Sequence, residues 1–346
     1  MQPTMRSIAR EAGVSAMTVS LALKDNPRIS KKTREKVKRV AHEMGYRTNP
    51  MVSSLMAHVR STRPIPYQAN LAFLSAFQEK DAMQHSLFTR RAYRGMCDRA
   101  EELGFLIDTF WLNQKDMHQG RIEKILTSRN IQGVILSPLD TSGTLEFLDW
   151  SQWSSTALGD SLLSPCLHHV THHQFHGISL ILEHLAQKGY RKIGLAVDAI
   201  SDDKVGNAWS ACMAGHQLRI RTKDRVPIFF ASEPFLEAGQ KKFSAWLDRY
   251  QPEVIIGHDG ILTWMSQMKL RIPRDFAFAH LSLPRENSFY RQLDFSGLNQ
   301  KWEKIGSAAV DLVVAQIHRN ERGIPTHPKT ILLQGSWLEG DTTPDL

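Results

Sequence analysis

The stretch that decides the N-terminal fold runs from residue 7 to residue 20 and reads Ser7-Ile8-Ala9-Arg10-Glu11-Ala12-Gly13-Val14-Ser15-Ala16-Met17-Thr18-Val19-Ser20. Ile8, Ala9 and Ala12 recur at the spacing of one helix face, and Gly13 suits a turn that needs a positive φ. Ser15 can accept a backbone N–H at the start of a second helix, expected from Ala16 to about Lys24. This pattern of two short helices around a tight turn is typical of a DNA-binding helix-turn-helix.

A third helix is expected from Lys31 to about Met44. Ser30 provides its N-cap, and Val37, Val40 and Ala41 fall on an inward face. The outward face is basic, with Lys31, Lys32, Arg34, Lys36, Lys38 and Arg39. Such a run is often only a solvated face; beside a helix-turn-helix it more readily adds attraction to DNA phosphates.

The charge of the chain is concentrated at its N-terminus. Residues 1–63 hold 13 Lys and Arg against 4 Asp and Glu, a net charge of +9, whereas the rest of the 346 residues hold 30 against 31. A phosphate-binding head on a nearly neutral body is the electrostatic pattern of a sequence-specific DNA binder.

Other bulk features favour a reduced, cytoplasmic protein. No run approaches the roughly 18 apolar residues that span a bilayer, and the polar, basic N-terminus lacks the apolar region of a secretory signal. The three cysteines, Cys97, Cys166 and Cys212, are scattered and odd in number, which argues against a disulfide framework.

The head resembles the headpiece of the LacI/GalR family of bacterial regulators. The resemblance rests on Ile8-Ala9-x-x-Ala12-Gly13-Val14-Ser15-x-x-Thr18-Val19-Ser20, Ile29-Ser30-x-x-Thr33-Arg34 and Gly45-Tyr46-x-x-Asn49. It implies base contacts in the major groove from Ala16, Met17 and Leu21. It also implies phosphate contacts from Thr4, Ser15, Thr18, Ser20, Asn26 and Ser30. The family often has a polar group where Leu21 stands, so direct readout is expected to be weak and DNA deformation to matter more.

Residues 49–57 look like the family's hinge helix, which completes a head of residues 1–57. The resemblance implies DNA contacts at Asn49, Val52 and Leu55, with Leu55 as a wedge in the minor groove. The alternative for Leu55 is a leucine in the core of a dimer. Residues 58–68, with Pro64 and Pro66, are expected to form a linker.

From residue 69 onward, strand-like and helix-like segments alternate. Strands are expected at 69–77, 105–112, 131–137, 192–197, 254–257, 276–281 and 330–334, and helices at 88–103, 116–129 and 177–188. Such alternation predicts doubly wound parallel sheets, in which ligands bind beyond the carboxyl ends of the strands.

The order of these elements resembles the family's effector domain, a two-lobed α/β body like a periplasmic binding protein. The resemblance implies three crossings between the lobes, expected near 163–168, 293–297 and 325–329. The first lobe is then about 69–165 with 297–327, and the second about 166–296 with 328–346. Closure of the lobes around a small, sugar-like effector would change the spacing of two heads in a homodimer, and so the affinity for DNA.

Strand ends and helix starts provide the residues expected to contact the effector. They are Phe77, Phe88, Ser137, His172, His173, Asn207, Asp259 and Ser282. At three of these places the chain departs from the family. The family has an Asp or Asn where His172 and His173 stand, commonly an Arg at Asn207, and an Asp at Ser282. The resemblance therefore does not imply a hexose or a purine as the effector. Trp264 could stack on a sugar face or belong to the core.

Five histidines lie between residues 168 and 176, and they leave one alternative open. Such a cluster can ligate Zn²⁺ or Ni²⁺, which would make a metal-responsive regulator. Neither a cysteine pair nor an adjacent acid accompanies it, so polar surface or pocket roles are favoured and no cofactor or metal is expected.

Two further classes of protein remain as alternatives. One is an architectural DNA binder without effector. The other is an enzyme on the same body, disfavoured because no phosphate loop, dinucleotide fingerprint or Gly-x-Ser-x-Gly motif occurs.

Overall fold

The N-terminal head is a bundle of three short helices. The structure is a computed structural model that describes residues 4–23, 29–46, 69–80, 87–146, 148–231, 237–283 and 293–346. The helices are α1 (Met5–Ala12), α2 (Ala16–Leu23) and α3 (Lys31–Glu43). The apolar stripes predicted from the sequence meet in one small core, formed by Ile8, Ala9, Ala12, Val19, Ala22, Val37, Val40 and Ala41. Gly13 ends α1 with a φ of 64°, which confirms the turn.

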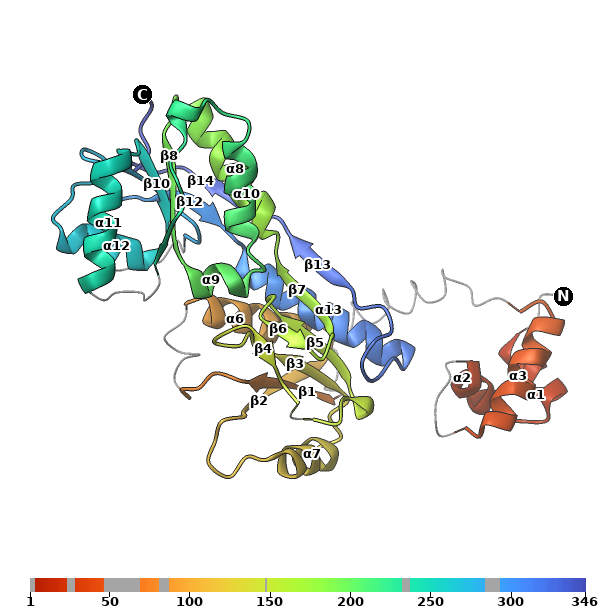
Figure 1. Ribbon diagram of the computed structural model, residues 1–346. Helices are drawn as coiled ribbons and strands as arrows, with labels where there is room; N and C mark the ends of the chain where they lie inside the picture. The colour runs from red at the N-terminus through yellow and green to blue at the C-terminus, as the bar shows by residue number, and fades with distance from the viewer. Residues whose placement is uncertain are drawn as a thin grey trace.

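The body contains two six-stranded sheets (Figure 1). The first has the order β13-β7-β5-β3-β1-β2 and is parallel throughout. Its strands are β1 (Ala69–Ser75), β2 (Phe105–Trp111), β3 (Gly133–Leu136), β5 (Ser154–Leu158), β7 (His168–His172) and β13 (Thr330–Leu333). A small pair, β4 (Gly143–Thr144) and β6 (Leu162–Ser164), lies beside it.

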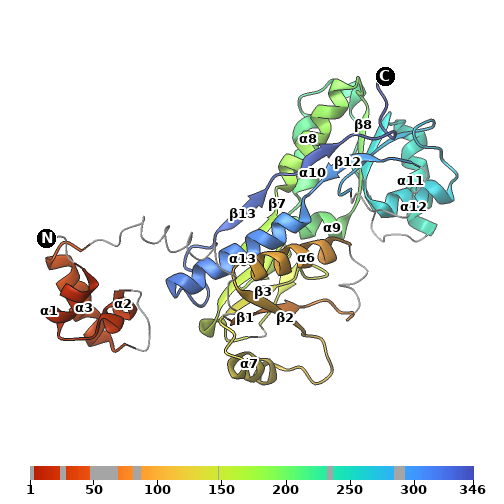
Figure 2. The same ribbon diagram turned by 180° about the vertical axis from the view of Figure 1, so that it is seen from behind.

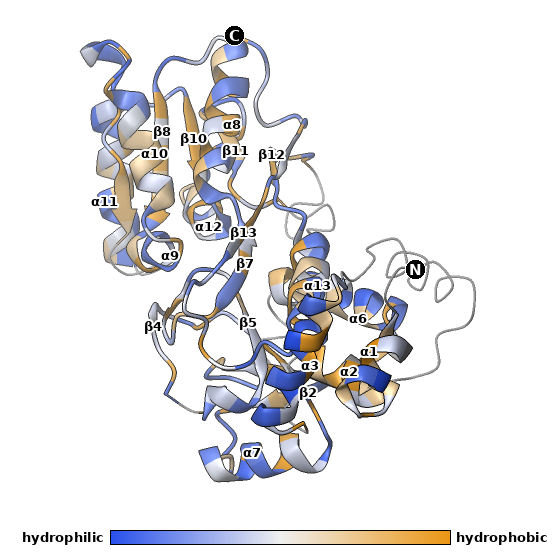
Figure 3. Ribbon diagram, turned by 90° about the vertical axis from the view of Figure 1, so that its right-hand side faces the viewer, coloured by the Kyte–Doolittle hydropathy of each residue, from blue (hydrophilic) through white to orange (hydrophobic). Residues whose placement is uncertain are grey.

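The second sheet has the order β14-β12-β11-β10-β8-β9, and only its edge strand β14 is antiparallel to its neighbour. Its strands are β8 (Ile193–Asp198), β9 (Phe229–Ala231), β10 (Val254–Gly257), β11 (Ala277–His280), β12 (Ser296–Asn299) and β14 (Ser336–Leu338). The central strands are buried along their whole length and mostly apolar, as expected for a sheet covered on both faces, and Figure 3 shows them largely in orange. The two doubly wound sheets confirm the predicted fold class.

Helices flank both sheets (Figure 2). The first lobe carries α6 (Leu87–Glu102), α7 (Gln119–Ser128) and α13 (Trp302–Arg319); the second carries α8 (Gln174–Gln187), α9 (Ala199–Lys204), α10 (Ala208–Gln217), α11 (Glu237–Tyr250) and α12 (Asp259–Gln267). In the described ranges, none of the helices is long and apolar enough to cross a membrane. Helices α6 and α13 pack closely because Gly306 lies directly against the backbone of Ala92, and Gly95 against that of Glu303.

The three crossings between lobes lie several residues later than predicted. The chain leaves the first sheet after β7 ends at His172, returns after β12 ends at Asn299, and crosses again between Leu333 and Ser336. The lobes are therefore 69–172 with 302–333, and 174–299 with 336–346, in place of the predicted limits. At the first crossing the error arose because His168–His172, a polar run, forms a strand that is almost wholly buried.

One histidine ring fills the meeting point of the crossings. His172 is fully buried, and its ring packs against Gly177 and Gly335, where an added Cβ would overlap it. Leu298, in β12 just before the second crossing, lies against the same glycines. The chain segments at all three crossings therefore pack against one another around the ring of His172.

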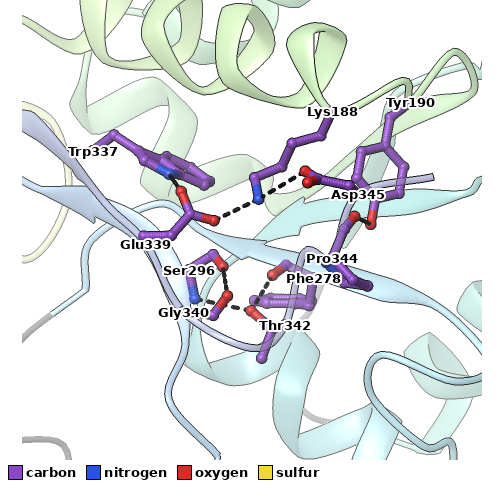
Figure 4. A network of polar contacts seen from close by, with 10 residues as sticks. All are labelled: Lys188, Tyr190, Phe278, Ser296, Trp337, Glu339, Gly340, Thr342, Pro344 and Asp345. Carbon is purple, nitrogen blue, oxygen red and sulfur yellow. Dashed lines mark hydrogen bonds and ion pairs between the residues drawn. The ribbon is translucent and has the colours of Figure 1, made fainter.

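The C-terminal tail fastens back onto the second lobe (Figure 4). The hydroxyl of the buried Thr342 donates to the carbonyl of Phe278 at 2.7 Å and accepts from the backbone N–H of Ser296 at 2.9 Å. Lys188, just after α8, forms ion pairs with Glu339 at 2.5 Å and Asp345 at 3.4 Å. The tail thus ties β11, β12 and α8 together.

Candidate nucleic-acid interface and effector site

Side-chain hydroxyls cap the N-termini of the three head helices. Thr4 forms a reciprocal capping box with Ser7, and Ser15 Oγ accepts the backbone N–H of Thr18 at 3.0 Å. Ser30 Oγ accepts that of Thr33 at 3.2 Å. Three of the predicted phosphate contacts therefore lie at the positive ends of helix dipoles, where an anion is stabilised.

Helix α2 presents an apolar outer face. Ala16 is exposed, Met17 is 73 % exposed, and Thr18 and Leu21 are half-buried. Ser20 also lies in α2, but its side chain is outside the part that the structure describes. The helix carries no acidic or basic residue along Ala16–Leu23.

Helix α3 carries the basic surface of the head. Lys31, Lys32, Lys36, Lys38 and Arg39 are all exposed. Arg39 lies 4.0 Å from Glu43, and basic residues outnumber acidic ones along the helix. The predicted DNA contacts at Asn26, Asn49, Val52 and Leu55, and the hinge as a whole, fall outside the described residues.

Two imidazole–carboxylate pairs stand at the carboxyl ends of adjacent strands in the second lobe. His258, after β10, has its Nε2 2.9 Å from Asp198 Oδ2 at the end of β8, and His280, ending β11, has its Nε2 3.1 Å from Asp259 Oδ1. In each ring, Nδ1 accepts a backbone N–H two residues further along the chain. The ring proton therefore belongs on Nε2, facing the carboxylate.

The electrostatics hold the buried member of the first pair in its charged form. Burial raises the pKa of Asp198, but the close contact with His258 and the hydrogen bond from Ser201 outweigh it and lower the value to about 2. Asp259, by contrast, is 68 % exposed while its partner His280 is almost fully buried. The second pair thus presents an accessible carboxylate that a buried ring orients.

Charged groups from both lobes act on Lys204, the last residue of α9. Burial lowers the pKa of Lys204, and the carboxylates of Asp140 and Asp198 offset part of that effect. Asp140 belongs to the first lobe, where it accepts the backbone N–H of Gln78 beyond β1. A second link joins the lobes, because Trp302 Nε1 donates to Ser282 Oγ at 3.3 Å.

Several of the predicted effector residues have structural roles. Ser137 is buried, and its hydroxyl accepts from Ala76 N and donates to the carbonyl of Pro138. Phe77 is buried, and Phe88 packs edge-on against Trp302 with ring centroids 4.2 Å apart. Trp264 lies in an aromatic core rather than at a ligand face.

The remaining predicted residues differ in accessibility. Asp259 and Ser282 lie at strand ends, and Asn207 is exposed with a φ of 58° just before α10. His173 caps α8 and accepts the N–H of His176. His172 is enclosed at the crossings and is not available to a ligand in this arrangement.

The histidines of residues 168–176 have separate roles. His168 accepts the backbone N–H of Lys329, His169 lies 3.4 Å from Asp160, and His172 is enclosed. Among the described residues, which include this whole stretch, no group of three or more His, Cys, Asp or Glu is arranged to hold a metal ion.

Four polar residues of the site were missed in the sequence: Asp198, Lys204, His258 and His280. A usable signal was present for three of them. Asp198 and His258 directly follow predicted strands, and His280 lies near the end of another. The rule that ligands bind beyond the carboxyl ends of parallel strands would have selected them.

Comparisons with known proteins agree with this organisation. Residues 4–49 match the family model for bacterial regulatory proteins of the lacI family, and residues 182–343 match that of a periplasmic binding protein-like domain. The regulator MalR of Streptococcus pneumoniae serotype 4 is 23 % identical over 79 % of this chain and 82 % of its own. The repressor PurR of Proteus mirabilis is 22 % identical over 95 % of each chain.

Solved structures share the fold from end to end. A complex of the transcriptional regulator CelR with cellobiose has a TM-score of 0.57, at 17 % identity and with 98 % of this chain and 99 % of that one covered. The lac repressor dimer bound to operator and the anti-inducer ONPF has a TM-score of 0.56, also at 17 % identity, with 99 % and 100 % covered. With a head and a body that match in this order, the chain belongs to the LacI family of bacterial transcriptional regulators.

Proposed function

We propose that this regulator is a repressor that binds a near-palindromic operator as a homodimer, and that a small effector between its lobes sets the affinity. Two identical heads need half-sites about one helical turn of DNA apart. Because its target is the chromosome, we place its action in the cytoplasm.

The observation that carries the DNA-binding part is the head itself. An uncharged, exposed α2 is combined with the exposed lysines and arginine of α3, in a segment whose net charge is +9. Phosphate attraction would supply most of the affinity, and α2 in the major groove would supply the direct readout. We further propose that Asn49, Val52 and Leu55 contact DNA through a hinge helix, with Leu55 inserted in the minor groove.

The effector part rests on the polar groups at the strand ends. Asp198 and Asp259, each held by a histidine, come from the second lobe, and Lys204 lies under the influence of Asp140 from the first. Carboxylates fixed in this way suit a ligand rich in hydroxyl donors. We therefore propose a sugar-like effector, in keeping with the cellobiose bound to the similar structure of CelR. A ligand held by both lobes would stabilise one lobe arrangement and so bias the heads.

Selection of genomic fragments by the purified full-length protein, footprinted at fixed near-physiological salt, tests the DNA-binding part. The expected result is a protected, roughly palindromic site with enhanced cleavage at its centre. Equal binding to all fragments, weakening steeply with salt, would contradict it and favour an architectural DNA binder.

A thermal-shift screen of mono- and disaccharides tests the effector part. A ligand that raises the melting temperature should also change operator affinity. Asp259→Asn should weaken that ligand about tenfold or more, because a charge-assisted hydrogen bond is lost. Asp248→Asn, at an exposed position on α11, is the matched control. If the ligand binds both variants equally well, Asp259 does not contact it.

A further inference from the structure

The outer face of α2 is unusual for a surface that meets nucleic acid, because an apolar side chain dominates it. Met17 is 73 % exposed, the most exposed of the large apolar side chains described in the head. The neighbouring Ala16 adds a methyl group, and Leu21 is half-buried. At this exposure Met17 lies outside the core of the head, and its side chain is accessible to a partner.

Two polar side chains next to Met17, among those that the structure describes, are engaged with each other. The hydroxyls of Ser15 and Thr18 lie 2.9 Å apart, and Ser15 Oγ also accepts the backbone N–H of Thr18. Both side chains therefore serve the N-terminus of α2. Since the helix also lacks charged residues, it offers no Arg, Lys, Asn or Gln for a bidentate bond to a purine.

Charge complementarity identifies the occupant of this face. The three-helix head that carries this apolar face is basic, because lysines and an arginine of α3 and Arg10 on α1 are exposed. A duplex presents the matching surface, with anionic phosphates along a groove that admits one helix. The only apolar group on the major-groove edge of a base pair is the C5-methyl of thymine.

We propose that Met17 reads the methyl group of a thymine in each operator half-site. This inference rests on the proposed function and adds the chemistry of its base recognition. The polarizable, unbranched thioether fits against a methyl group without needing exact hydrogen-bond geometry. Enclosing one methyl predicts a preference of roughly three- to fivefold for each half-site, and about tenfold or more when both halves of a dimeric site are changed.

Replacement of thymine by deoxyuridine tests the proposal, since it removes only the methyl group. The probe is the duplex recovered by the full-length protein from a random library, with each thymine changed in turn. One thymine in each half-site should show the three- to fivefold loss. With Met17→Ala, binding to the thymine and uridine forms should become equal.

Two further variants keep the test decisive. Met17→Gln preserves the length of the side chain and should also lose the sensitivity to the methyl. Met5→Ala, which removes another exposed methionine of the head, should retain it. If uridine has no effect at any position, or if its effect persists in Met17→Ala and Met17→Gln, Met17 does not read thymine. If the library yields no preferred sequence, the proposed function itself fails.

Discussion

Replacing His172 by leucine should remove a large part of the acid sensitivity of this protein. The ring is enclosed between Gly177 and Gly335 at the crossings between lobes. Neither ring nitrogen has a hydrogen-bond partner of good geometry among the described residues, although the Leu333 carbonyl lies close enough to favour the protonated ring in part. A leucine keeps an apolar side chain between Gly177 and Gly335 and removes the group that takes up a proton.

The magnitude follows from the burial of the ring. Burial lowers the pKa of His172 to about 4, with smaller opposing effects from the Leu333 carbonyl and Asp160, and with His173 and His176 adding to the shift. In the unfolded chain the pKa is about 6.5, so the unfolded state takes up the proton first as pH falls. The stability that the neutral ring of His172 contributes is therefore fully present above pH 6.5, and it is lost as the pH falls towards 4. Between pH 8 and pH 5 the loss is about 2 kcal/mol.

Urea unfolding followed by tryptophan fluorescence at pH 8 and pH 5 measures this loss. The free energy of unfolding should fall by about 2 kcal/mol less in His172→Leu than in the unmodified protein. His327→Leu, at an exposed position, should keep the original pH dependence. An unchanged pH dependence in His172→Leu would refute the assignment of the acid sensitivity to this ring.

Three other changes have definite expected outcomes. Gly306→Ala should destabilise the first lobe by about 3 kcal/mol in thermal unfolding because the added Cβ would overlap the backbone of α6. Gly215→Ala, with open space around it, should be neutral or stabilising, and equal effects of the two changes would contradict the packing argument. Thr342→Val should cost about 2 kcal/mol in urea unfolding, since two buried backbone groups lose their partner; an unchanged midpoint would count against a structural role for the tail. Lys36→Ala should weaken operator binding and reduce the slope of log affinity against log salt by about one, while Lys241→Ala on α11 should not; equal slopes would remove α3 from the interface.

Much of the architecture could be predicted because its signals are local. The head follows from the turn at Gly13, from the caps at Ser15 and Ser30, and from apolar spacing that needs no distant partner. The strand Val254–Gly257 was predicted with the limits that the structure gives, because a buried apolar run leaves little choice.

What the sequence concealed depends on contacts between distant segments. His168–His172 is polar in composition, yet it pairs with strands on both sides, including β13 about 160 residues later. The same applies to the two histidine–carboxylate pairs, which join Asp198 to His258 and Asp259 to His280 across neighbouring strands. No local pattern identifies such partners, since only the sheet order brings them together.

The interleaved course of the chain also determines how new regulators of this kind can be assembled. The head occupies one continuous stretch, so a single joint between residues 46 and 69 would graft it onto another sensor. Neither lobe is continuous: exchanging one requires joints near 173, 300 and 334 at once, all next to the ring of His172. Gene recombination can therefore change the DNA target in one event, whereas a new effector specificity is more accessible through substitutions at the strand ends than through exchange of a whole lobe.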